Sequence, residues 1–306
     1  MNIMVTSAGG PAAIGVIKSL KDMNFDGKII AVDCNELSAG LYMSDIKHIV
    51  PEAKHDNFQK EIFRIVRDSN VDLILPTGNH DICQLSKMDK VLGMIDVKLF
   101  MSDLNVIELC GDKWEFYNKC KDKFPLPKTS LNWGDIGFPL FAKPRIEVGG
   151  SRGAQICKIY SEAKVLDNTY EYVYQENLPG QEYTIDVLCD MESNPLVIIP
   201  RKRLQTKAGI SSKGEIVKNE FIEKACFDMC KFLKLKGPVC LQMKEDVNGV
   251  PRFIEVNPRF GGGTFFTTLA GVNFLPIILD LVNGHKPEIS EPELIKVVRY
   301  YEEIVI

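Results

Sequence analysis

The sequence lacks the patterns that mark membrane, secreted or disulfide-linked proteins. No apolar run approaches the roughly 18 residues that a membrane-spanning helix needs. The N-terminal segment MNIMVTSAGG lacks the basic and long apolar regions of a secretory signal. The nine cysteines are scattered and form no C-x-x-C pair, which argues against a disulfide framework and against a zinc site. We therefore expect a cytoplasmic protein with no membrane partner.

The sequence also lacks a large excess of either positive or negative charge, since the formal net charge is only −4 over 306 residues. This balance provides no bulk attraction for phosphate backbones, so we expect no nucleic-acid partner. No G-x-x-x-x-G-K-[ST] motif occurs, which excludes a P-loop nucleotide site. What is present is an ordinary globular composition, 45% hydrophobic and 25% charged, over a length that suffices for two domains.

The first third of the chain alternates strand patterns with helical patterns. Apolar strand segments occur near residues 2–9, 28–34, 71–78 and 98–102, and amphipathic helical segments separate them. Strands separated by helical patterns of about 10 to 15 residues are typical of βαβ units and a parallel sheet. The sequence therefore predicts a Rossmann-like α/β domain over residues 1–104.

From residue 105 the pattern changes to an α+β arrangement. A single helical segment is predicted at 105–123, followed by several strand candidates, among them AQICKIYS at residues 154–161. Farther along, strand candidates at 238–246 and 251–257 are joined by the turn VNGV. Hairpins and helices are segregated here rather than alternating, so the sequence predicts a second domain over 105–306.

Two glycines lie between a strand and a helix in the segment TSAGGPAAIG, residues 6–15. Backbone amides at such a helix N-terminus can bind an anion. Asp33 ends the next strand, where a dinucleotide-binding fold carries its ribose-binding carboxylate. The spacing is not G-x-G-x-x-G, because Gly9 and Gly10 are adjacent. The residues leave open a tight turn without ligand, a site for a small anionic group and, less favoured, a nicotinamide site.

The segment PTGNHD, residues 76–81, follows a predicted strand at its C-terminal end. Ligands of open parallel sheets bind outside these strand ends, so His80 and Asp81 are candidates to face the crevice. A lone histidine in a loop is more often an exposed residue than a catalytic one, and that interpretation of His80 is favoured.

A lysine and a glycine-rich loop follow one another after residue 140. Lys143 lies inside the apolar strand PLFAKPR, where its ammonium group could reach a phosphate oxygen as a point charge. A glycine-rich loop can close over phosphates with its amides as donors. The alternative is a hairpin with a solvated lysine. The loop contains Gly149, Gly150, Ser151, Arg152 and Gly153.

The segment FIEVNPRFGGG, residues 253–263, is an apolar strand that ends in polar groups. Glu255 and Asn257 are two residues apart and therefore project from the same face of the strand. If the hairpin turns at VNGV, Gln242 on the partner strand comes near them. Three oxygen donors with little charge of their own suit Mg²⁺ that also binds phosphate. Arg259 would then be placed to hold charge on a transferring phosphoryl group. The alternative is an exposed polar hairpin.

Together these motifs resemble the ATP-grasp enzymes. The resemblance rests on E-V-N-P-R at 255–259, Lys143-Pro144, the G-G-S-R-G loop and the segment YQENLPGQEYTIDV. It is closest to the branch that contains the carbamoyl-phosphate synthase large subunit, biotin carboxylase and related carboxylate–amine ligases. It implies a Rossmann-like pre-ATP-grasp domain at 1–104 and an ATP-grasp fold at 105–306, with a mobile lid at about 128–177.

The resemblance also implies roles for individual residues. The implied nucleotide-binding residues are Lys113, Lys143, Gly149, Gly150, Ser151, Arg152, Gly153, Glu176, Asn177, Leu178, Glu182 and Gln242. The implied ligands of Mg²⁺, with Mn²⁺ as an alternative, are Gln242, Glu255 and Asn257. The implied catalytic residues are Arg259, Lys143, Arg201 and Arg203.

The function implied by the resemblance is ATP-dependent ligation. A carboxylate would be activated as an acyl-phosphate and attacked by an amine to form an amide, so the partners are small-molecule carboxylate and amine substrates. One rival uses bicarbonate or carbamate as the phosphate acceptor, as in carbamoyl-phosphate synthase, which carries two ATP-grasp units where this chain has one. Another is an ATP-binding regulatory module without turnover. The sequence leaves the oligomeric state open, with a homodimer as one option.

Overall fold

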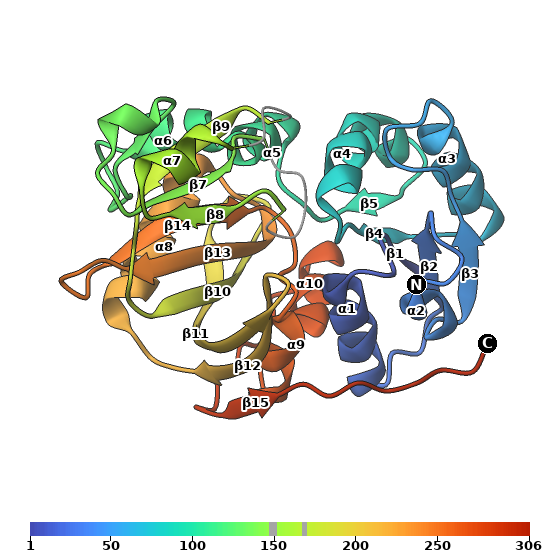
Figure 1. The fold of residues 1–306 in the computed structure, drawn as a ribbon. Helices are drawn as coiled ribbons and strands as arrows, with labels where there is room; N and C mark the ends of the chain where they lie inside the picture. The colour runs from blue at the N-terminus through green and yellow to red at the C-terminus, as the bar shows by residue number, and fades with distance from the viewer. Residues whose placement is uncertain (147–151, 167–169) are drawn as a thin grey trace.

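The computed structural model describes residues 1–146, 152–166 and 170–306 and contains three β-sheets. A parallel sheet lies on one side of the molecule in Figure 1, and two antiparallel sheets lie on the other. The combination of a parallel N-terminal sheet with antiparallel sheets confirms the predicted α/β and α+β classes. Three residues of the predicted phosphate-covering loop, Gly149, Gly150 and Ser151, fall outside the described residues.

The N-terminal sheet has the strand order β3-β2-β1-β4-β5, with all neighbours parallel. The central strands are continuous apolar runs that are buried on both faces, as parallel strands covered by helices should be. The elements are β1 (Ile3–Val5), α1 (Pro11–Asp22), β2 (Ile29–Asp33), α2 (Ala39–Tyr42), β3 (Ile46–Ile49), α3 (Phe58–Asp68), β4 (Leu73–Leu75), α4 (Asn79–Gly93) and β5 (Lys98–Leu99).

Two helices and a small antiparallel sheet come next along the chain. The sheet has the order β6-β9-β7-β8 and its own small core, and it corresponds in position to the predicted lid. The elements are α5 (Leu104–Gly111), α6 (Lys113–Cys120), β6 (Thr129–Ser130), the 3-10 helix η1 (Trp133–Asp135), β7 (Leu140–Pro144), β8 (Gln155–Cys157), α7 (Tyr160–Lys164) and β9 (Tyr172–Glu176).

The large antiparallel sheet has the order β14-β13-β10-β11-β12-β15. Helix α8 packs on one face of it through residues at helical spacing, and its N-cap Asn219 accepts a hydrogen bond from the Ile222 amide. The elements are β10 (Glu182–Cys189), β11 (Pro195–Lys207), β12 (Ile210–Ile216), α8 (Glu220–Leu233), β13 (Gly237–Glu245), β14 (Pro251–Asn257), α9 (Thr264–Leu269), α10 (Phe274–Val282) and β15 (Lys296–Val298).

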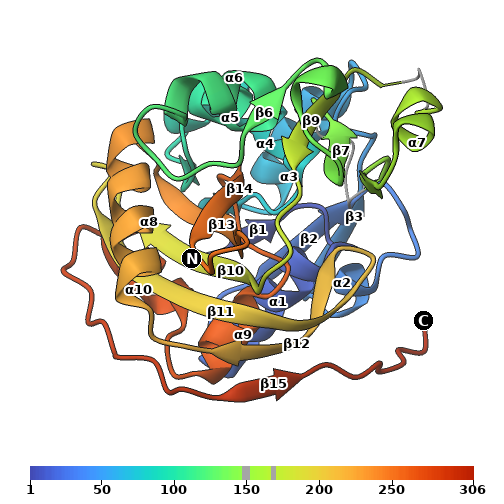
Figure 2. The same ribbon diagram turned by 60° about the vertical axis from the view of Figure 1, so that its left-hand side comes forward.

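One hydrophobic core is shared between the N-terminal region and the large sheet. Helices α9 and α10, late in the chain, lie beside α1 between the two sheets in Figure 1. A buried hydrogen bond of 2.7 Å joins the hydroxyls of Ser19 and Thr268, and Asn273 Nδ2 donates to the Ser19 carbonyl. Figure 2 shows the C-terminal segment passing along β12 through β15. The shared core holds the cleft between the two regions in a defined geometry.

The structure corrects two sequence predictions. The single helix expected over 105–123 is two helices, because Asp112 adopts an extended conformation and caps α6 by accepting from the amides of Trp114 and Glu115. The strand expected around 154–161 ends at Cys157, and α7 begins at Tyr160. In each case a local side-chain or turn conformation overrides the apolar pattern.

No helix in the described residues is long and apolar enough to cross a membrane. The nine cysteines are free thiols, and seven of them are buried. The thiols of Cys110, Cys226 and Cys230 lie in the core under α8, where burial raises the pKa of Cys226 well above its usual value. These cysteines therefore behave as small apolar core residues.

Candidate active site

A cleft of about 660 Å³ lies where the N-terminal loops, the small sheet and the large sheet meet. The predicted site residues that line it are Lys113, Lys143, Arg152, Glu176, Asn177, Leu178, Glu182, Arg201, Arg203, Gln242, Glu255, Asn257 and Arg259. Gly153 is described but does not line the cleft; its backbone lies against Pro144 and Tyr170. The structure thus brings together side chains that are up to 146 residues apart, from Lys113 to Arg259.

The β13–β14 hairpin places the three predicted metal ligands together. Gln242 pairs directly with Glu255, and Asn257 pairs with Cys240 two residues along β13. A bulge between this pair and the Met243–Phe253 pair gives β14 one extra residue, Ile254. Because of the bulge, the adjacent residues Ile254 and Glu255 both line the cleft while Phe253 stays fully buried.

The donor set of this hairpin fits Mg²⁺ better than a metal that needs several protein ligands. It contains one carboxylate, on Glu255, and two amide oxygens, on Gln242 and Asn257. Within the described residues no group of three or more His, Cys, Asp or Glu side chains forms a metal-binding cluster. Mg²⁺ is commonly bound by one or two carboxylates together with substrate phosphates. The residues present are compatible with a metal that is bound jointly by protein and nucleotide.

The side chain of Lys143, on β7 of the small sheet, reaches the β13–β14 hairpin. This side chain is buried, and Nζ donates to the Ile254 carbonyl over 2.8 Å. Burial is the main cause that lowers the pKa of Lys143 to about 8; the charge of Glu255 opposes this change, and the charge of Lys113 adds to it. An ammonium group with few protein partners and a lowered pKa is suited to an anionic ligand that would restore its charge.

Arg259 follows the hairpin and links it to the N-terminal region. Its Nη1 donates to the Phe260 carbonyl over 2.8 Å, and its Nη2 donates to Asn257 Oδ1 over 3.1 Å. Its Nε donates to Asn79 Oδ1, at the first residue of α4. Each of these acceptors is a neutral oxygen, so these bonds orient the guanidinium without neutralising it.

Two more arginines lie on β11 and are paired with acids on β10. Arg201 is fully buried, and its Nη2 lies 3.2 Å from Asp186 Oδ2, which also accepts from Thr267 Oγ1. Arg203 Nη1 donates to Glu182, the predicted ribose-binding acid. The charge of each arginine is thus balanced inside the protein, unlike that of Arg259.

The predicted adenine-binding segment lies at the end of β9. Glu176 Oε1 accepts from the Lys128 amide over 3.0 Å, and Asn177 and Leu178 line the same side of the cleft. Lys113 begins α6 directly after the cap Asp112, whose carboxylate pairs with Arg145 over 2.8 Å. This ion pair ties the start of α6 to β7.

The opposite end of the cleft is made by the β1–α1 and β4–α4 turns. Ser7, Gly10, Thr77, Gly78 and His80 line it. The carboxylate of Asp33 accepts from the Gly9 amide over 2.8 Å, and the Gly10 amide donates to the Ser7 carbonyl. Asp33 therefore caps the turn in the manner of a structural residue, and both glycine amides are already used.

Some residues of the site had no role in the sequence prediction. Asn79 lay within PTGNHD without an assigned function, and its contact with Arg259 spans 180 residues. The sequence does indicate a role for Asp186, because an acid inside the apolar strand TIDVLC needs a buried partner. Thr184 and Lys244 also line the cleft, from β10 and β13.

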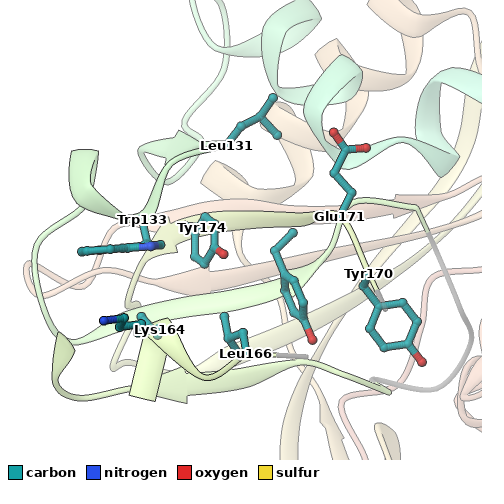
Figure 3. A pocket seen from close by; sticks show the side chains of 9 residues that line it. Leu131, Trp133, Lys164, Leu166, Tyr170, Glu171 and Tyr174 are labelled. Atoms are coloured by element: carbon teal, nitrogen blue, oxygen red, sulfur yellow. The ribbon is translucent and has the colours of Figure 1, made fainter. Parts of the chain in front are cut away.

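A second, smaller pocket of about 260 Å³ lies in the small sheet (Figure 3). Figure 3 shows Trp133 and Tyr174 on one side of it and Lys164 and Leu166 on the other. It is mainly aromatic and apolar and contains none of the predicted site residues. The candidate chemistry therefore belongs to the larger cleft.

Comparison with protein families gives two matches. Residues 169–304 match the family described as ATP-grasp in the biosynthetic pathway with Ter operon. The likeness to an ATP-grasp family therefore covers the C-terminal part of the chain. Residues 3–100 match the family described as PylC-like, N-terminal domain, so both family matches follow the order of domains that the ATP-grasp resemblance implies.

Solved structures of three enzymes share the fold across nearly the whole chain. Biotin carboxylase from Campylobacter jejuni superposes with a TM-score of 0.73 at 16% identity, covering 95% of this chain and 73% of that one. N5-carboxyaminoimidazole synthetase from Staphylococcus aureus, solved with ADP, gives 0.72 at 15%, covering 95% and 78%. L-amino acid ligase from Bacillus licheniformis gives 0.68 at 15%, covering 92% and 74%. At these identities the likeness establishes the fold.

Proposed function

We propose that this protein is an ATP-dependent carboxylate–amine ligase that forms an amide by way of an acyl-phosphate. The observation that carries the proposal is the convergence in one cleft of a buried lysine, an oxygen-donor hairpin and an arginine that no acid neutralises. The fold shared with a biotin carboxylase and an amino acid ligase supports the same class of reaction.

In this proposal the nucleotide binds at the small-sheet end of the cleft. The adenine lies against the end of β9, at Glu176, Asn177 and Leu178, and Glu182 is close enough to Arg203 to present an oriented carboxylate to the ribose. Lys113 and Lys143 bind phosphate oxygens. Arg152 and the glycine-rich residues that precede it cover the phosphates when the small sheet, residues 128–177, closes as a lid.

Gln242, Glu255 and Asn257 would hold Mg²⁺, which neutralises phosphate charge when it is bound. The carboxylate oxygen of the substrate attacks the γ-phosphorus, and the bond to the β–γ bridging oxygen breaks to release ADP. The amine then attacks the acyl carbon, loses a proton, and inorganic phosphate leaves with the bonding electron pair. Arg259 stabilises the negative charge that develops in both steps. Arg201 and Arg203 contribute positive charge to the same region.

Other properties follow from the same proposal. The division at residue 104 separates a substrate-selecting region, 1–104, from the ATP-grasp region, 105–306. The partners are small-molecule carboxylates and amines in the cytoplasm, Mn²⁺ substitutes for Mg²⁺, and a homodimer is compatible with the chain. The charged side chains that line the cleft are the features that suit small, charged substrates.

The test is an ADP-release screen with Mg²⁺-ATP against paired carboxylates and amines. We expect ADP formation to require an organic acid and the amide to appear only with an amine. Glu255→Ala should reduce turnover by about 10²- to 10³-fold, whereas Glu215→Ala should not change it, because Glu215 lies on β12 away from the cleft lining.

Three results would contradict the proposal in different ways. ADP formation driven by bicarbonate alone would favour a carbamoyl-phosphate type of reaction. Tight ATP binding without ADP formation across the panel would favour a regulatory module. Turnover that survives Glu255→Ala unchanged would show that the metal is bound elsewhere.

A further inference from the structure

A serine and a half-buried aspartate form a short hydrogen bond at the N-terminal end of the cleft. Ser7, which lines the cleft just after β1, donates from Oγ to Asp81 Oδ2 over 2.5 Å. Ser7 has a positive φ of 52°, a conformation that costs energy for a residue with a side chain. Asp81 lies behind it, in the first turn of α4. The positive φ of Ser7 thus places its hydroxyl at the cleft surface at the expense of backbone strain.

The direction of this hydrogen bond determines what Ser7 can bind. A hydroxyl has a single proton, and here it is committed to the Asp81 carboxylate. Ser7 therefore presents only lone pairs to the cleft and can bind a donor but not an anion. The charged groups around the pair are Asp33 at the end of β2 and His80 on α4, and Cys34 lies near both acids.

The pair lies beside the arginine that would hold the acyl-phosphate. A Cβ atom added to Gly78 would lie only 2.0 Å from Ser7 Oγ, so the two turns touch at this point. Gly78 immediately precedes Asn79, whose Oδ1 accepts from Arg259 Nε. Ser7 and Arg259 therefore line the same end of the cleft, linked by the Gly78–Asn79 turn.

We propose that Ser7 binds the amine substrate and that the Ser7–Asp81 pair removes its proton. The inference rests on the proposed ligase function and adds to it the residues that act on the nucleophile. As the amine nitrogen bonds to the acyl carbon and phosphate leaves, one N–H proton passes to Ser7 Oγ. The original hydroxyl proton of Ser7 passes to the Asp81 carboxylate. The substrate class follows: a primary or secondary amine, with no anionic group next to the attacking nitrogen.

The protonation behaviour of Asp81 suits this role. Burial raises the pKa of Asp81 above its usual value, Asp33 raises it further, and the hydrogen bond from Ser7 and the charge of His80 lower it. A general base is more effective when its pKa is nearer the working pH. The relay needs the ionised carboxylate, so amide formation should fall as the pH drops through the raised pKa.

The experiment compares two nucleophiles on the same acyl-phosphate. Both nucleophiles lose one N–H proton when they bond to the acyl carbon. The adduct of the weakly basic hydroxylamine is acidic enough to lose this proton to water and gives a hydroxamate without a general base, whereas the adduct of a more basic alkylamine needs a base to remove the proton. Ser7→Gly removes the hydroxyl and relaxes the positive φ, and Asp81→Asn keeps the shape but not the proton acceptor. For both variants we expect the ratio of amide to hydroxamate to fall by about 10²- to 10⁴-fold, and the amide rate to recover as the pH is raised.

The matched control is a second serine–aspartate pair outside the cleft. Ser130 Oγ donates to Asp135 Oδ2 over 2.6 Å in the small sheet, so Ser130→Ala and Asp135→Asn should leave the ratio unchanged. The inference is overturned if Ser7→Gly lowers amide and hydroxamate equally, or if His80→Ala alone reproduces the loss. Absence of any hydroxamate with the wild-type protein would instead refute the ligase function on which the inference depends.

Discussion

The two ends of the cleft are built in different ways. At the end where we propose that the nucleotide binds, side chains project from paired antiparallel strands, and the register of β13 and β14 fixes Gln242 opposite Glu255. At the N-terminal end, the groups come from two turns between parallel strands and helices, where Ser7 and Gly78 are in contact. One end is specified by strand pairing and the other by turn conformation.

This difference suggests a division of labour. Strand pairing places charged groups with little freedom, which suits phosphate and metal binding that is common to many substrates. Turns tolerate changes of sequence more readily, so they are the natural place to select the acid and the amine. Arg259 is the residue through which the two ends meet, since it contacts Asn257 on one side and Asn79 on the other.

Removal of the Arg259 side chain, which connects the two ends of the cleft, should have the largest effect on activity. Arg259→Ala should reduce kcat by about 10²- to 10³-fold, because the arginines on β11, Arg201 and Arg203, are already paired with acids and cannot replace its charge. The control is Arg252→Ala on β14, the strand that precedes Arg259; the Arg252 side chain pairs with Asp246 at 2.7 Å and does not line the cleft. Steady-state ADP release measures both. An equal loss in the two variants would mean that the hairpin, and not Arg259, had been damaged.

A milder change removes only the contact between the two ends. Asn79→Ala deletes the acceptor for Arg259 Nε, and a hydrogen bond to a charged group contributes about 1.5–3 kcal/mol. We expect kcat to fall by roughly 10- to 100-fold while the KM for ATP stays constant, because the nucleotide end is untouched. Separate measurement of kcat and KM checks this expectation.

Asn79→Asp serves as the rescue variant, since it retains an oxygen acceptor and should restore most of the rate. Asn57→Ala, at the start of α3 and outside the cleft lining, is the control for a general effect on helix starts. A rise in KM for ATP with unchanged kcat in Asn79→Ala would show that the two ends are not coupled through Arg259.

The nucleotide end was the more predictable part of the molecule. Glu255 and Asn257 lie two residues apart, and a turn at Asn248-Gly249 predicts that Gln242 on the partner strand comes near them. The observed pairing of Gln242 with Glu255 confirms that geometry. The parallel sheet of the N-terminal region was equally predictable from the sequence, because alternating strand and helix patterns have few alternative arrangements.

Other features could not be predicted because they depend on contacts distant in sequence or on single backbone angles. The bulge at Ile254 changes which residues of β14 face the cleft, but no residue type in the sequence predicts it. The break at Asp112 depends on a cap and on Arg145, 33 residues away. The Asn79–Arg259 and Ser7–Asp81 contacts join turns and strands that only the folded chain brings together.

The smallest expected effect concerns the charge of Lys143 at the nucleotide end. Burial lowers the pKa of Lys143 to about 8 from the usual 10.5, so the ammonium group loses its proton as the pH rises through 8. ADP affinity measured without divalent metal should weaken there, by up to about tenfold per pH unit, which corresponds to about 1.4 kcal/mol. ADP binding near pH 8 should take up protons, which calorimetry in buffers of different ionisation enthalpy detects.

Stability should change in the opposite direction over the same range. Between pH 8 and 10.5 the unfolded chain binds more protons at this lysine than the native protein does, so the Lys143 contribution to the free energy of unfolding rises with pH. In Lys143→Met, ADP should bind weakly at every pH and without proton uptake. If the wild-type affinity stays flat from pH 7 to 9.5 while Lys143→Met still weakens binding, the lysine acts by packing, and its charge is not what holds the phosphate.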